Sequence, residues 1–435
     1  MKESAGKVLM LLENAFPADS RVRNEAATLT SNGIKVTVIA LRGRNEPARE
    51  VVDGVTVYRL PRLTVFRKLP DSQRSLLGRL LGKLKRVTGY LVEYGYFTGG
   101  CLLLSVYIAV REGFDVVHAH NPPDMLFVVG AFHKLLGKKF VFDHHDLSPE
   151  LYLSRFRTTE GGLITRVLQL LEWCSVRLAN VLIVTNASYR EIDIARHGAV
   201  PERVFIVRNG PDLKRVRLVD PDERLRGSGK TILGYVGAMN PQDGVDYMLR
   251  ALQHLRQLGK DNFYCVVVGD GDSREELETL AKTLGLENHV WFTGFIPDAD
   301  MIRYLSTADI CLDPNPSSPL NDVSTWIKVM EYMALGKPVV SFDLKETRTS
   351  AEDAAVYVPP NDEAAFAKAV AALMDDADRR QKMGAIGRRR VDEKLSWNIT
   401  SRNLLSAYGQ LLRTTFPAPN AQALPPESSS RTAGA

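Results

Sequence analysis

Histidine and carboxylate side chains follow two apolar segments of this 435-residue sequence. His118 and His120 end the run DVVHAH, and a later run is followed by four polar residues in a row, Asp143 to Asp146. Both residue types can bind a metal ion. Four ligands from one short stretch cannot surround an ion well, so the pattern predicts no metal site there. A turn whose polar groups are all satisfied is the plainer alternative.

Two glycine-rich turns could bring backbone N–H groups to a phosphate. Gly237 and Gly244 bracket the loop that leads into a helical stretch, and the amino end of a helix favours an anion. An ordinary strand-to-helix connection would look the same. In VVVGDGDS, Ser273 stands where the dinucleotide fingerprint needs its third glycine, so the sequence does not favour a dehydrogenase.

A lysine and a glutamate lie three residues apart in STWIKVMEYMALGKPVV. Lys328 and Glu331 would share one face of a helix, which Gly336 and Pro338 would end. A carboxylate can accept hydrogen bonds from two neighbouring hydroxyls, and a lysine can place positive charge near an anion. The alternative is a surface ion pair worth about 0.2 to 0.5 kcal/mol.

These residues belong to a repeating pattern of short apolar, β-branched runs separated by helical stretches. Such a pattern is typical of parallel sheets built from βαβ units. It predicts strands at residues 7–14, 35–41, 115–120, 140–145, 181–186 and 204–207, and again at 232–237, 263–271, 290–295, 310–314 and 338–343. We therefore expect an α/β protein with two doubly wound halves that face a cleft, and ligands at the carboxyl ends of the strands.

The length of the chain also favours two domains, because single cores stop growing at roughly 250 to 300 residues. We predict a Rossmann-like amino-terminal domain at 1–210, a linker at 211–230 and a Rossmann-like carboxyl-terminal domain at 231–395. A last helix at 396–415 is expected to pack back towards the amino-terminal domain. The tail at 416–435 is rich in Pro, Ala and Ser and is expected to be disordered.

Composition places the chain among ordinary globular proteins, with 45% hydrophobic and 25% charged residues. Its four cysteines are far apart and form no CxxC pair, which predicts free thiols in a reducing compartment. The apolar start is interrupted at Glu13, so no signal peptide is indicated and a cytoplasmic location is expected. The uncharged run from Tyr94 to Val110 contains three glycines and predicts a buried helix.

Positive charge is concentrated between Arg62 and Arg86, where eight basic residues stand against Asp71. The rest of the chain is slightly acidic, which argues against nucleic-acid binding. Within residues 74–87, the apolar positions from Leu76 to Val87 cover an arc of about 140° on a helix, and basic residues lie opposite. Such a helix can lie on an anionic membrane surface. A solvated helix packed on the amino-terminal domain would show the same pattern.

Longer motifs occur in both halves of the chain in a fixed order. The carboxyl half has GDGDSREELETLAKTLGLENHVWFTGFIP and STWIKVMEYMALGKPVVSFD, and the amino half has DSRVRNEAATLTSNGIKVTVIAL, FDVVHAHNPPD and FVFDHHDLSPELY. Together these motifs resemble the glycosyltransferases of family 4, which have the two-domain GT-B fold. The resemblance spans about residues 7–412 and is greatest to bacterial transferases of surface polysaccharide and lipid-linked oligosaccharide assembly.

This resemblance implies which residues bind the donor. The glutamate that opens the family's E-x-M-A-x-G-x-P-V-V helix is similar to Glu331 and would accept hydrogen bonds from the ribose of the nucleotide. Lys328 would lie near the diphosphate, together with the backbone N–H groups of Ser324 and Thr325 at a helix start. The remaining implied donor contacts are Gly237, Gly269, Phe295 and Ile296.

The sequence departs from the family pattern at three positions. Val323 stands where many members have a first glutamate, and Ala238 and Asp243 stand where an arginine and a lysine often contact the diphosphate. Lys328 and the helix start at Ser324 are therefore expected to bind the phosphates.

The resemblance also implies an acceptor side in the amino half. There, Asp19 is expected to cap a helix, and Arg21 and Arg23 leave that helix on different faces, so at most one of them points to the phosphates. His120 is the histidine that the resemblance places close to the transferred sugar, with His118 further inside. The other acceptor-side candidates are His145, Asp146 and Glu150.

We therefore expect a retaining glycosyltransferase of hexosyl or N-acetylhexosaminyl type, in which His120, Lys328 and Glu331 carry the reaction. Its donor would be a nucleotide-diphosphate sugar, UDP-linked in the first instance, and its acceptor a saccharide or polyprenyl-linked saccharide. The resemblance implies no metal or other cofactor. It places the enzyme in polysaccharide or glycolipid biosynthesis, bound through residues 74–87 to the inner face of the plasma membrane. The alternatives are a GT-B nucleotide-sugar epimerase and a non-catalytic, nucleotide-sugar-binding subunit of a transferase complex.

Overall fold

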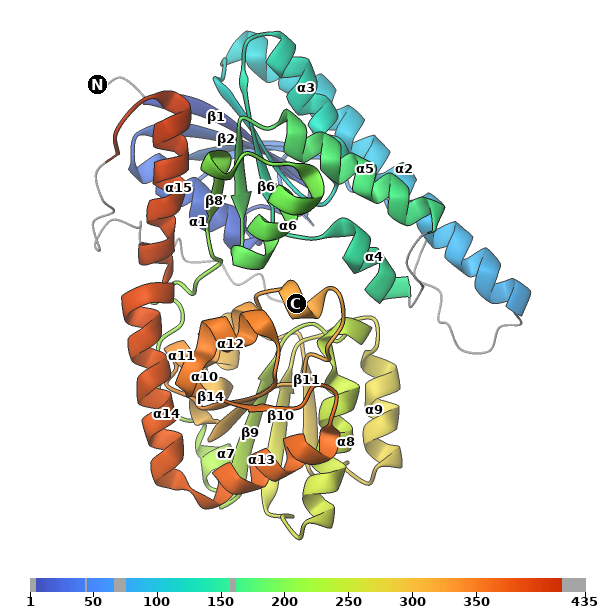
Figure 1. Cartoon of the computed structure of the whole chain (residues 1–435), viewed down its shortest axis with the longest axis vertical. Helices are drawn as coiled ribbons and strands as arrows, with labels where there is room; N and C mark the ends of the chain where they lie inside the picture. Colours follow the sequence, from blue (N-terminus) through green and yellow to red (C-terminus); the bar gives the residue numbers. More distant parts are fainter. Residues whose placement is uncertain (1–4, 44, 66–75, 157–161, 417–435) are drawn as a thin grey trace. The chain divides into compact units, whose positions relative to one another are not determined.

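The computed structural model describes residues 5–43, 45–65, 76–156 and 162–416, and within helix α2 it describes side chains from Thr88 onward. Residues 417–435 of the tail predicted at 416–435 therefore lie outside the described residues, as do residues 74–75 and the side chains of residues 76–87 in the predicted basic helix. Two compact units make up the chain (Figure 1). The described residues within 1–152, 159–207 and 401–435 form unit 1, and those within 153–158 and 208–400 form unit 2.

Unit 1 is built on an eight-stranded sheet of order β3-β4-β2-β1-β5-β6-β7-β8. Neighbouring strands are parallel except β3, which pairs with β4 in the antiparallel sense at one edge. Along the sheet the strands are β3 (Arg49–Val52), β4 (Val55–Leu60), β2 (Ile34–Leu41), β1 (Gly6–Leu12), β5 (Val116–His120), β6 (Lys139–His144), β7 (Val181–Val184) and β8 (Val204–Ile206).

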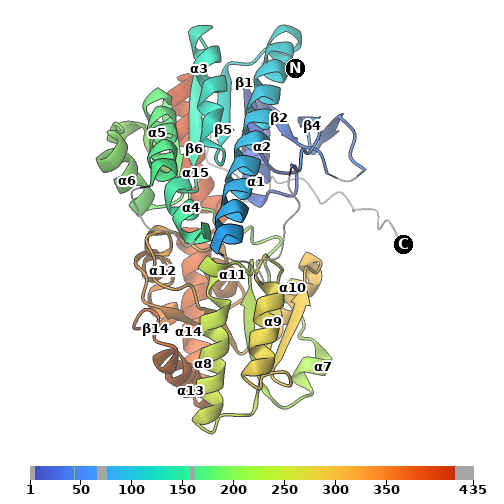
Figure 2. The ribbon, with the colours of Figure 1, turned by 90° about the vertical axis from the view of Figure 1, so that its right-hand side faces the viewer.

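Helices cover both faces of this sheet. Figures 1 and 2 show α2, α3 and α5 side by side over one face, and α3 packs against both of its neighbours. Helix α15 lies on the opposite side, and its residues from 401 onward belong to unit 1. The helices are α1 (Ser20–Ser31), α2 (Leu76–Arg111), α3 (Phe127–Leu135), α4 (Ser148–Phe156), α5 (Leu163–Leu178), α6 (Ala187–His197) and α15 (Trp397–Leu412), with 3₁₀ turns η1 (Asp124–Leu126) and η2 (Pro201–Arg203).

Unit 2 has a six-stranded parallel sheet of order β11-β10-β9-β12-β13-β14. Its strands are β9 (Thr231–Val236), β10 (Phe263–Val268), β11 (Val290–Gly294), β12 (Ile310–Asp313), β13 (Val339–Phe342) and β14 (Ala355–Val358). Its helices are α7 (Glu223–Arg226), α8 (Val245–Gln257), α9 (Arg274–Thr283), α10 (Asp298–Thr307), α11 (Ile327–Ala334), α12 (Lys345–Ala351), α13 (Glu363–Asp375) and α14 (Ala377–Arg390). Shorter turns are η3 (Pro241–Asp243), η4 (Asn321–Val323), η5 (Glu352–Ala354) and the π-turn η6 (Val391–Leu395).

The structure confirms the predicted α/β class with two Rossmann-like sheets, and each predicted strand is present. Three further strands, β3, β4 and β14, were not predicted; two of them form an edge hairpin and the third is only four residues long. Residues 211–230, predicted as a linker, belong to unit 2. Val216 and Leu225 are buried in its core, and Asp222 caps the short helix α7 through the Leu225 N–H group.

Strand order reverses once within each sheet, between β1 and β5 in unit 1 and between β9 and β12 in unit 2. Open α/β sheets bind ligands in the crevice outside the carboxyl ends of strands at such a reversal. In unit 1 these ends lead to the turn before α1 and to His120, and in unit 2 to Gly237 and Asp313. The topology therefore predicts ligand binding at the same strand ends that the sequence predicts.

Candidate functional site

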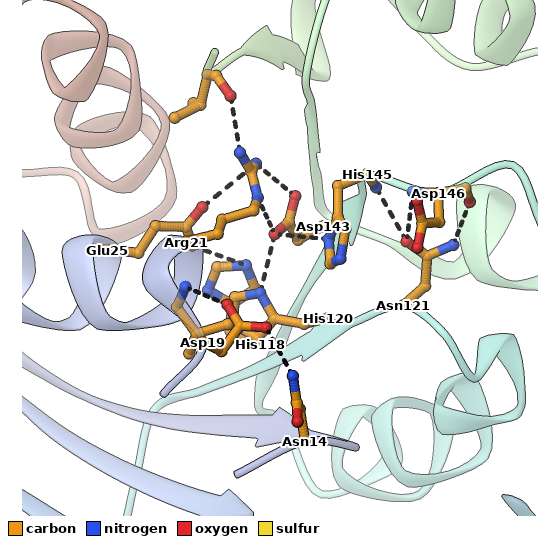
Figure 3. A network of polar contacts seen from close by, with 12 residues as sticks. Asn14, Asp19, Arg21, Glu25, His118, His120, Asn121, Asp143, His145 and Asp146 are labelled. Atoms are coloured by element: carbon orange, nitrogen blue, oxygen red, sulfur yellow. Dashed lines mark hydrogen bonds and ion pairs between the residues drawn. The ribbon is translucent and has the colours of Figure 1, made fainter. Parts of the chain in front are cut away.

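In unit 1, the site begins at the paired ends of β5 and β6. His120 is the last residue of β5 and lies opposite Asp143 in the register of the two strands. Both side chains are buried, and His120 Nδ1 lies 2.8 Å from Asp143 Oδ2 (Figure 3). The two residues form a histidine–carboxylate pair at the point where the sheet reverses.

Arg21 fixes the carboxylate of this pair from helix α1. Its Nε and Nη2 atoms each donate a 2.7 Å hydrogen bond to Asp143, and Nη1 donates to the Val207 carbonyl at 3.0 Å. Burial alone would raise the pKa of Asp143, but the Arg21 guanidinium holds that pKa well below its usual range. Asp143 is therefore ionised, and Arg21 is an internal counter-ion whose donors are directed inward rather than to a phosphate.

The pair sets the tautomer of His120. Burial lowers the pKa of His120 below its ordinary value, although the bond to Asp143 opposes this, so the ring is neutral near pH 7. A neutral ring beside a carboxylate carries its proton on Nδ1, which leaves a lone pair on Nε2. Within the described part of the chain, Nε2 has no hydrogen-bond partner. The Nε2 lone pair can therefore accept a hydrogen bond or a proton, but the atom is buried, so neighbouring groups must move before a ligand reaches it.

His118 lies behind His120 and has a different set of partners. Its Nδ1 atom lies 2.9 Å from the Tyr408 hydroxyl, and the two imidazole rings are 4.2 Å apart. Its Nε2 atom is 3.8 Å from Glu25, a carboxyl whose pKa burial raises well above the usual range. His118 and Glu25 are both completely buried, and His118 joins the sheet to helix α15 through Tyr408 and to helix α1 through Glu25.

Four side chains of this cluster have the residue types of a metal site. Potential ligand atoms of Glu25, His118, His120 and Asp143 lie within 4.8 Å of one another. Arg21, however, already binds Asp143 through two bonds and lies 3.3 Å from Glu25. A guanidinium thus occupies the place where a cation would balance these carboxylates, and the cluster is best described as a buried ion network.

The other acceptor-side candidates do not all belong to this network. Asp19 accepts the Val22 N–H group at 3.0 Å, which confirms the predicted helix cap, and Arg23 is half-buried on the same helix. His145 shares Asp143 at 3.2 Å, so it belongs to the histidine–carboxylate group. Glu150 is buried and paired with Arg196 at 2.5 Å.

Asn121 joins the loops that follow β5 and β6, a role that was not predicted from the sequence. Its side-chain amide donates to the Asp146 carbonyl at 2.6 Å and to Asp124 at 3.1 Å, and its oxygen accepts the His145 N–H group at 2.9 Å. The residue is buried. Its position directly after His120, in the motif HAHNPPD, was the available signal.

His144 points to the other face of β6, as expected for adjacent residues of a strand. Its Nδ1 and Nε2 atoms contact Asp193 at 2.8 Å and Glu172 at 3.1 Å, and His197 contacts Glu172 at 2.9 Å. The polar run from Asp143 to Asp146 therefore divides between two networks, with His120 and Asp143 in one and His144 in the other.

Glu172→Gln is expected to make the free energy of unfolding less dependent on pH in the acidic range. Burial alone would raise the pKa of Glu172, but its bonds to His144 and His197 lower it to about 2. A depressed carboxylate pKa contributes stability above the unfolded-state pKa near 4.5, and that stability is lost as pH falls towards 2. The shift corresponds to about 3 kcal/mol.

Urea unfolding of the wild type and Glu172→Gln at several pH values between about 3 and 6 measures this contribution. The gap between the two proteins should be widest near pH 6 and should narrow on acidification. The matched control is the exposed Glu202→Gln. A gap that stays constant with pH would show that Glu172 acts by packing rather than by charge.

In unit 2, the predicted nucleotide-binding glutamate is already held by an arginine. Glu331 lies on α11, and its Oε1 atom accepts a 2.6 Å bond from Arg215, which also contacts Asp298 at 2.8 Å. Burial raises the pKa of Glu331 although Arg215 opposes that rise. Sequence reasoning missed Arg215, because its segment was interpreted as a linker.

Lys328 contacts an acidic residue at the end of β12. Its Nζ atom is 3.5 Å from Asp313 Oδ1 and lies over the rings of Tyr235 and Trp326, at 4.9 and 5.3 Å from their centroids. Asp313 Oδ2 also accepts the Ser341 hydroxyl at 3.0 Å. The lysine therefore lies at the sheet reversal of unit 2, and its partner there is Asp313 rather than Glu331.

The predicted helix start at Ser324 is displaced. Helix α11 begins at Ile327, and the Ser324 N–H group bonds to the Asn321 carbonyl at 3.3 Å, within the preceding turn. Ser324 and Thr325 therefore lie before the helix, and the first N–H groups of α11 come from Ile327 onward. The backbone is extended at Ser324 and again at Trp326, with ψ of 141° and 118°, so the helix begins only at Ile327.

Gly237 and Gly269 lie where the loops after β9 and β10 meet. A Cβ atom at Gly269, whose φ is +131°, would stand 1.9 Å from the Gly237 carbonyl oxygen, so the approach requires glycine. Gly237 N–H itself donates to the Val268 carbonyl at 3.0 Å. Phe295 is 90% exposed after β11, whereas Ile296 packs against the core.

The positions that depart from the family pattern have local structural roles. Asp243 is buried, and its side chain accepts the Asn240 N–H group at 3.1 Å in a capping box. The Ala238 carbonyl accepts the Tyr235 hydroxyl at 2.8 Å, and Val323 ends the turn before α11.

Comparison with known proteins agrees with both units. Residues 217–390 match the family described as Glycosyl transferases group 1, and residues 18–210 match the Glycosyl transferase 4-like domain. The chain belongs to glycosyltransferase family 4. It is thus a glycosyltransferase that uses a nucleotide-sugar donor.

Two members of the family are similar in sequence to most of this chain. An uncharacterized glycosyltransferase of Methanocaldococcus jannaschii is 24% identical, covering 88% of this chain and 91% of the relative. The phosphatidyl-myo-inositol mannosyltransferase of Mycobacterium leprae is 26% identical, covering 69% and 74%.

Two solved structures share the fold. Sucrose-phosphate synthase of Thermosynechococcus elongatus has a TM-score of 0.70 at 19% identity, covering 94% of this chain and 99% of that one. The Anabaena protein HepE in complex with UDP-glucose has a TM-score of 0.65 at 17% identity, covering 93% and 100%. These likenesses support the GT-B arrangement of two Rossmann-like domains.

Proposed function

We propose that this enzyme transfers a sugar from a UDP-sugar, with retention of anomeric configuration, to a saccharide on a membrane lipid. The observation that carries the proposal is the His120–Asp143 pair, which leaves the neutral, buried Nε2 atom of His120 without a hydrogen-bond partner among the described residues, at the sheet reversal of unit 1. A group of this kind suits a sugar hydroxyl, which can donate a hydrogen bond to the ring. In this role His120 orients the transferred sugar, and Asp143 and Arg21 position the ring.

The proposed reaction needs no protein nucleophile. The bond between the anomeric carbon and the diphosphate breaks, and an acceptor hydroxyl forms the new bond from the same side. The hydroxyl proton passes to the departing phosphate oxygen. The protein contributes orientation of both substrates, and orientation alone accounts for a large part of many rate enhancements.

On the donor side, Glu331 binds the ribose hydroxyls in this proposal, and Lys328 with the first N–H groups of α11 lies nearest the phosphates. The solved structure of HepE contains UDP-glucose, which supports a uridine nucleotide as the first donor to test. Glu331, Lys328 and the start of α11 belong to one segment of unit 2, so a single element can bind both ends of the nucleotide diphosphate.

The proposed acceptor is a lipid-linked saccharide at the inner face of the plasma membrane, reached through the basic residues 74–87. Two observations support it. The sequence places most of the excess positive charge in and around that segment, and one relative is named for an acceptor lipid, phosphatidyl-myo-inositol.

A donor and acceptor panel tests the proposal. Purified enzyme is incubated with UDP-, GDP- and ADP-sugars and with polyprenyl-linked or short water-soluble saccharides, and products are identified by mass spectrometry and NMR. We expect one UDP-sugar to give an α-linked product from an α-linked donor. An inverted product, or an epimerised free donor with no transfer, would contradict the proposal. Binding of nucleotide without transfer to any acceptor would instead favour a non-catalytic subunit.

A further inference from the structure

We infer that helices α2, α3 and α5 present an apolar face that inserts into the interfacial region of an anionic lipid bilayer. This inference deepens the proposed function and rests on its membrane acceptor, but it concerns described residues outside the basic segment. The apolar face consists of Val92, Tyr96, Leu103, Val106, Tyr107 and Val110 of α2, Val128, Phe132, Leu135 and Leu136 of α3, and Leu163, Val167, Leu170 and Trp173 of α5.

Helix α2 exposes a continuous stripe that carries no charge. Leu103 and Val110 are 76% and 83% exposed, and their exposed neighbours recur every three or four residues from Val92 to Tyr107. Between Thr88 and Val110 the sequence has one charged residue, Glu93, which is half-buried and accepts the Val65 N–H group at 3.0 Å. Water-facing stripes of globular helices normally carry charged and polar residues.

The opposite side of α2 is packed within unit 1. Phe97, Cys101, Ser105 and Ile108 are buried, and a Cβ atom at Gly100 would lie 2.7 Å from Leu60. By length and composition the stretch from Thr88 to Arg111 could cross a membrane. Only 28% of its most apolar part is buried, so it is not an ordinary core helix. The predicted buried helix is therefore buried on one side only, which favours a helix that lies in the membrane surface.

Neighbouring helices extend the stripe into a broader surface. Helix α3 packs against α2 and α5, and all three are adjacent in both views (Figures 1 and 2). Leu135 at the end of α3 and Leu163 at the start of α5 are 88% and 78% exposed, and Trp173 is also exposed. Exposed apolar side chains gathered on three adjacent helices mark an interaction site.

Charge at this face selects a lipid surface over a second copy of the chain. Its exposed or half-buried cations are Arg111, Lys134, Arg166 and Arg177, whereas the acid of α5, Glu172, is completely buried. In the sequence, Arg79, Lys83 and Arg86 precede this part of α2. A two-fold contact would bring this basic rim against itself, while anionic headgroups would neutralise it.

Aromatic residues on the face fit the same occupant. Tyr96, Tyr107 and Trp173 combine an apolar ring with a polar group, a combination enriched at the boundary between acyl chains and headgroups. Insertion of apolar side chains persists at high salt, whereas adsorption through lysine and arginine weakens. Salt dependence therefore separates the apolar face from the basic segment.

Vesicle flotation of the full chain provides the test, with phosphatidylcholine vesicles that contain about one third phosphatidylglycerol. At about 0.5 M NaCl we expect the wild type to remain bound, because charges are screened within a few ångströms. Leu103→Ser with Val110→Ser, and separately Leu170→Ser with Trp173→Ser, should each lower high-salt binding roughly tenfold or more. Trp173 fluorescence, taken as the difference from Trp173→Phe, should shift to the blue when vesicles are added.

Two control variants make the outcome specific. Val51→Ser with Leu258→Ser removes exposed apolar residues elsewhere and should bind like the wild type. Replacement of Arg79, Lys83 and Arg86 by glutamine should weaken binding at low salt and leave the high-salt fraction. UDP affinity and near-ultraviolet circular dichroism verify that each variant is folded.

Three results would overturn the inference. They are an absence of wild-type binding at high salt, equal binding by the serine variants, and a wild-type dimer that dissociates on Leu103→Ser with Val110→Ser while vesicles remain unbound. The vesicles contain no saccharide, so vesicle binding in an enzyme that fails the transfer assay would support the inference and contradict the proposed function. Transfer to a water-soluble acceptor by an enzyme that binds no vesicles would support the transferase activity and contradict the inference.

Discussion

Glu331→Ala is expected to raise the dissociation constant for UDP roughly 10- to 150-fold. The carboxylate is proposed to accept two ribose hydroxyls, and hydrogen bonds to charged groups contribute about 1.5 to 3 kcal/mol. Stability should change less than binding, because Arg215 keeps its 2.8 Å contact with the exposed Asp298. Calorimetric titration with UDP measures the first quantity, and thermal unfolding measures the second.

The contact with Arg215 supplies the control for this prediction. Asp298→Ala removes the other acidic partner of Arg215 and leaves Glu331 in place. We expect it to bind UDP within about twofold of the wild type, since exposed ion pairs are worth about 0.2 to 1 kcal/mol. If Asp298→Ala weakens UDP binding as much as Glu331→Ala does, the effect acts through Arg215 and the ribose assignment is wrong.

The cations described around α11 are already paired with carboxylates, so it is less clear from the structure which groups bind the donor phosphates than which group binds the ribose. Lys328 contacts Asp313, Arg215 contacts Glu331, and Arg208 contacts Glu346 at 3.4 Å. A diphosphate would have to compete with these carboxylates or use backbone N–H groups at the start of α11. Ala238 and Asp243 provide no cation for the diphosphate, and Lys328, Arg215 and Arg208 are each already paired with a carboxylate.

The sequence could predict the architecture because strand periodicity and glycine-bracketed turns are local signals. It could place His120 and Asp143 at strand ends for the same reason. It could not show that Arg21 binds Asp143, since 122 residues separate them and their contact depends on the neighbouring positions of α1 and β6. Nor could it show that Arg215 reaches Glu331, because a charged, glycine-containing stretch looks like a linker until its few apolar residues are seen packed.

The uncharged run from Tyr94 to Val110 illustrates a different limit. A helix that is apolar on all sides is normally buried, and composition alone gives no reason to expect otherwise. Burial depends on whether other elements cover each side, and here α3, the turn η1 and Leu60 of β4 lie against only one. The helix itself was predicted correctly, but its complete burial was not, and its exposed side is part of the apolar face.

His120→Ala is expected to lower kcat by about 10² to 10⁴ while UDP affinity stays near the wild-type value. The side chain is proposed to orient the transferred sugar rather than the nucleotide, and losing a positioned catalytic contact has costs of this size. Single-turnover kinetics with the donor and acceptor found by the panel would measure the change. His118→Ala is the matched comparison, because the His118 ring contacts Tyr408 and lies 4.2 Å from the His120 ring but is not among the proposed substrate contacts.

The pH dependence distinguishes a neutral His120 from a protonated one. Burial lowers the pKa of His120, so its neutral form persists down to below about pH 6.5 and kcat/KM should show no His120 titration between pH 6.5 and 8. If kcat/KM in the wild type rises through an apparent pKa above 7 that His120→Ala abolishes, the ring is protonated in the free enzyme and Asp143 stabilises an imidazolium instead. A turnover by His120→Ala equal to that of the wild type would remove the residue from the mechanism and leave Asp143 and Arg21 as a structural ion pair.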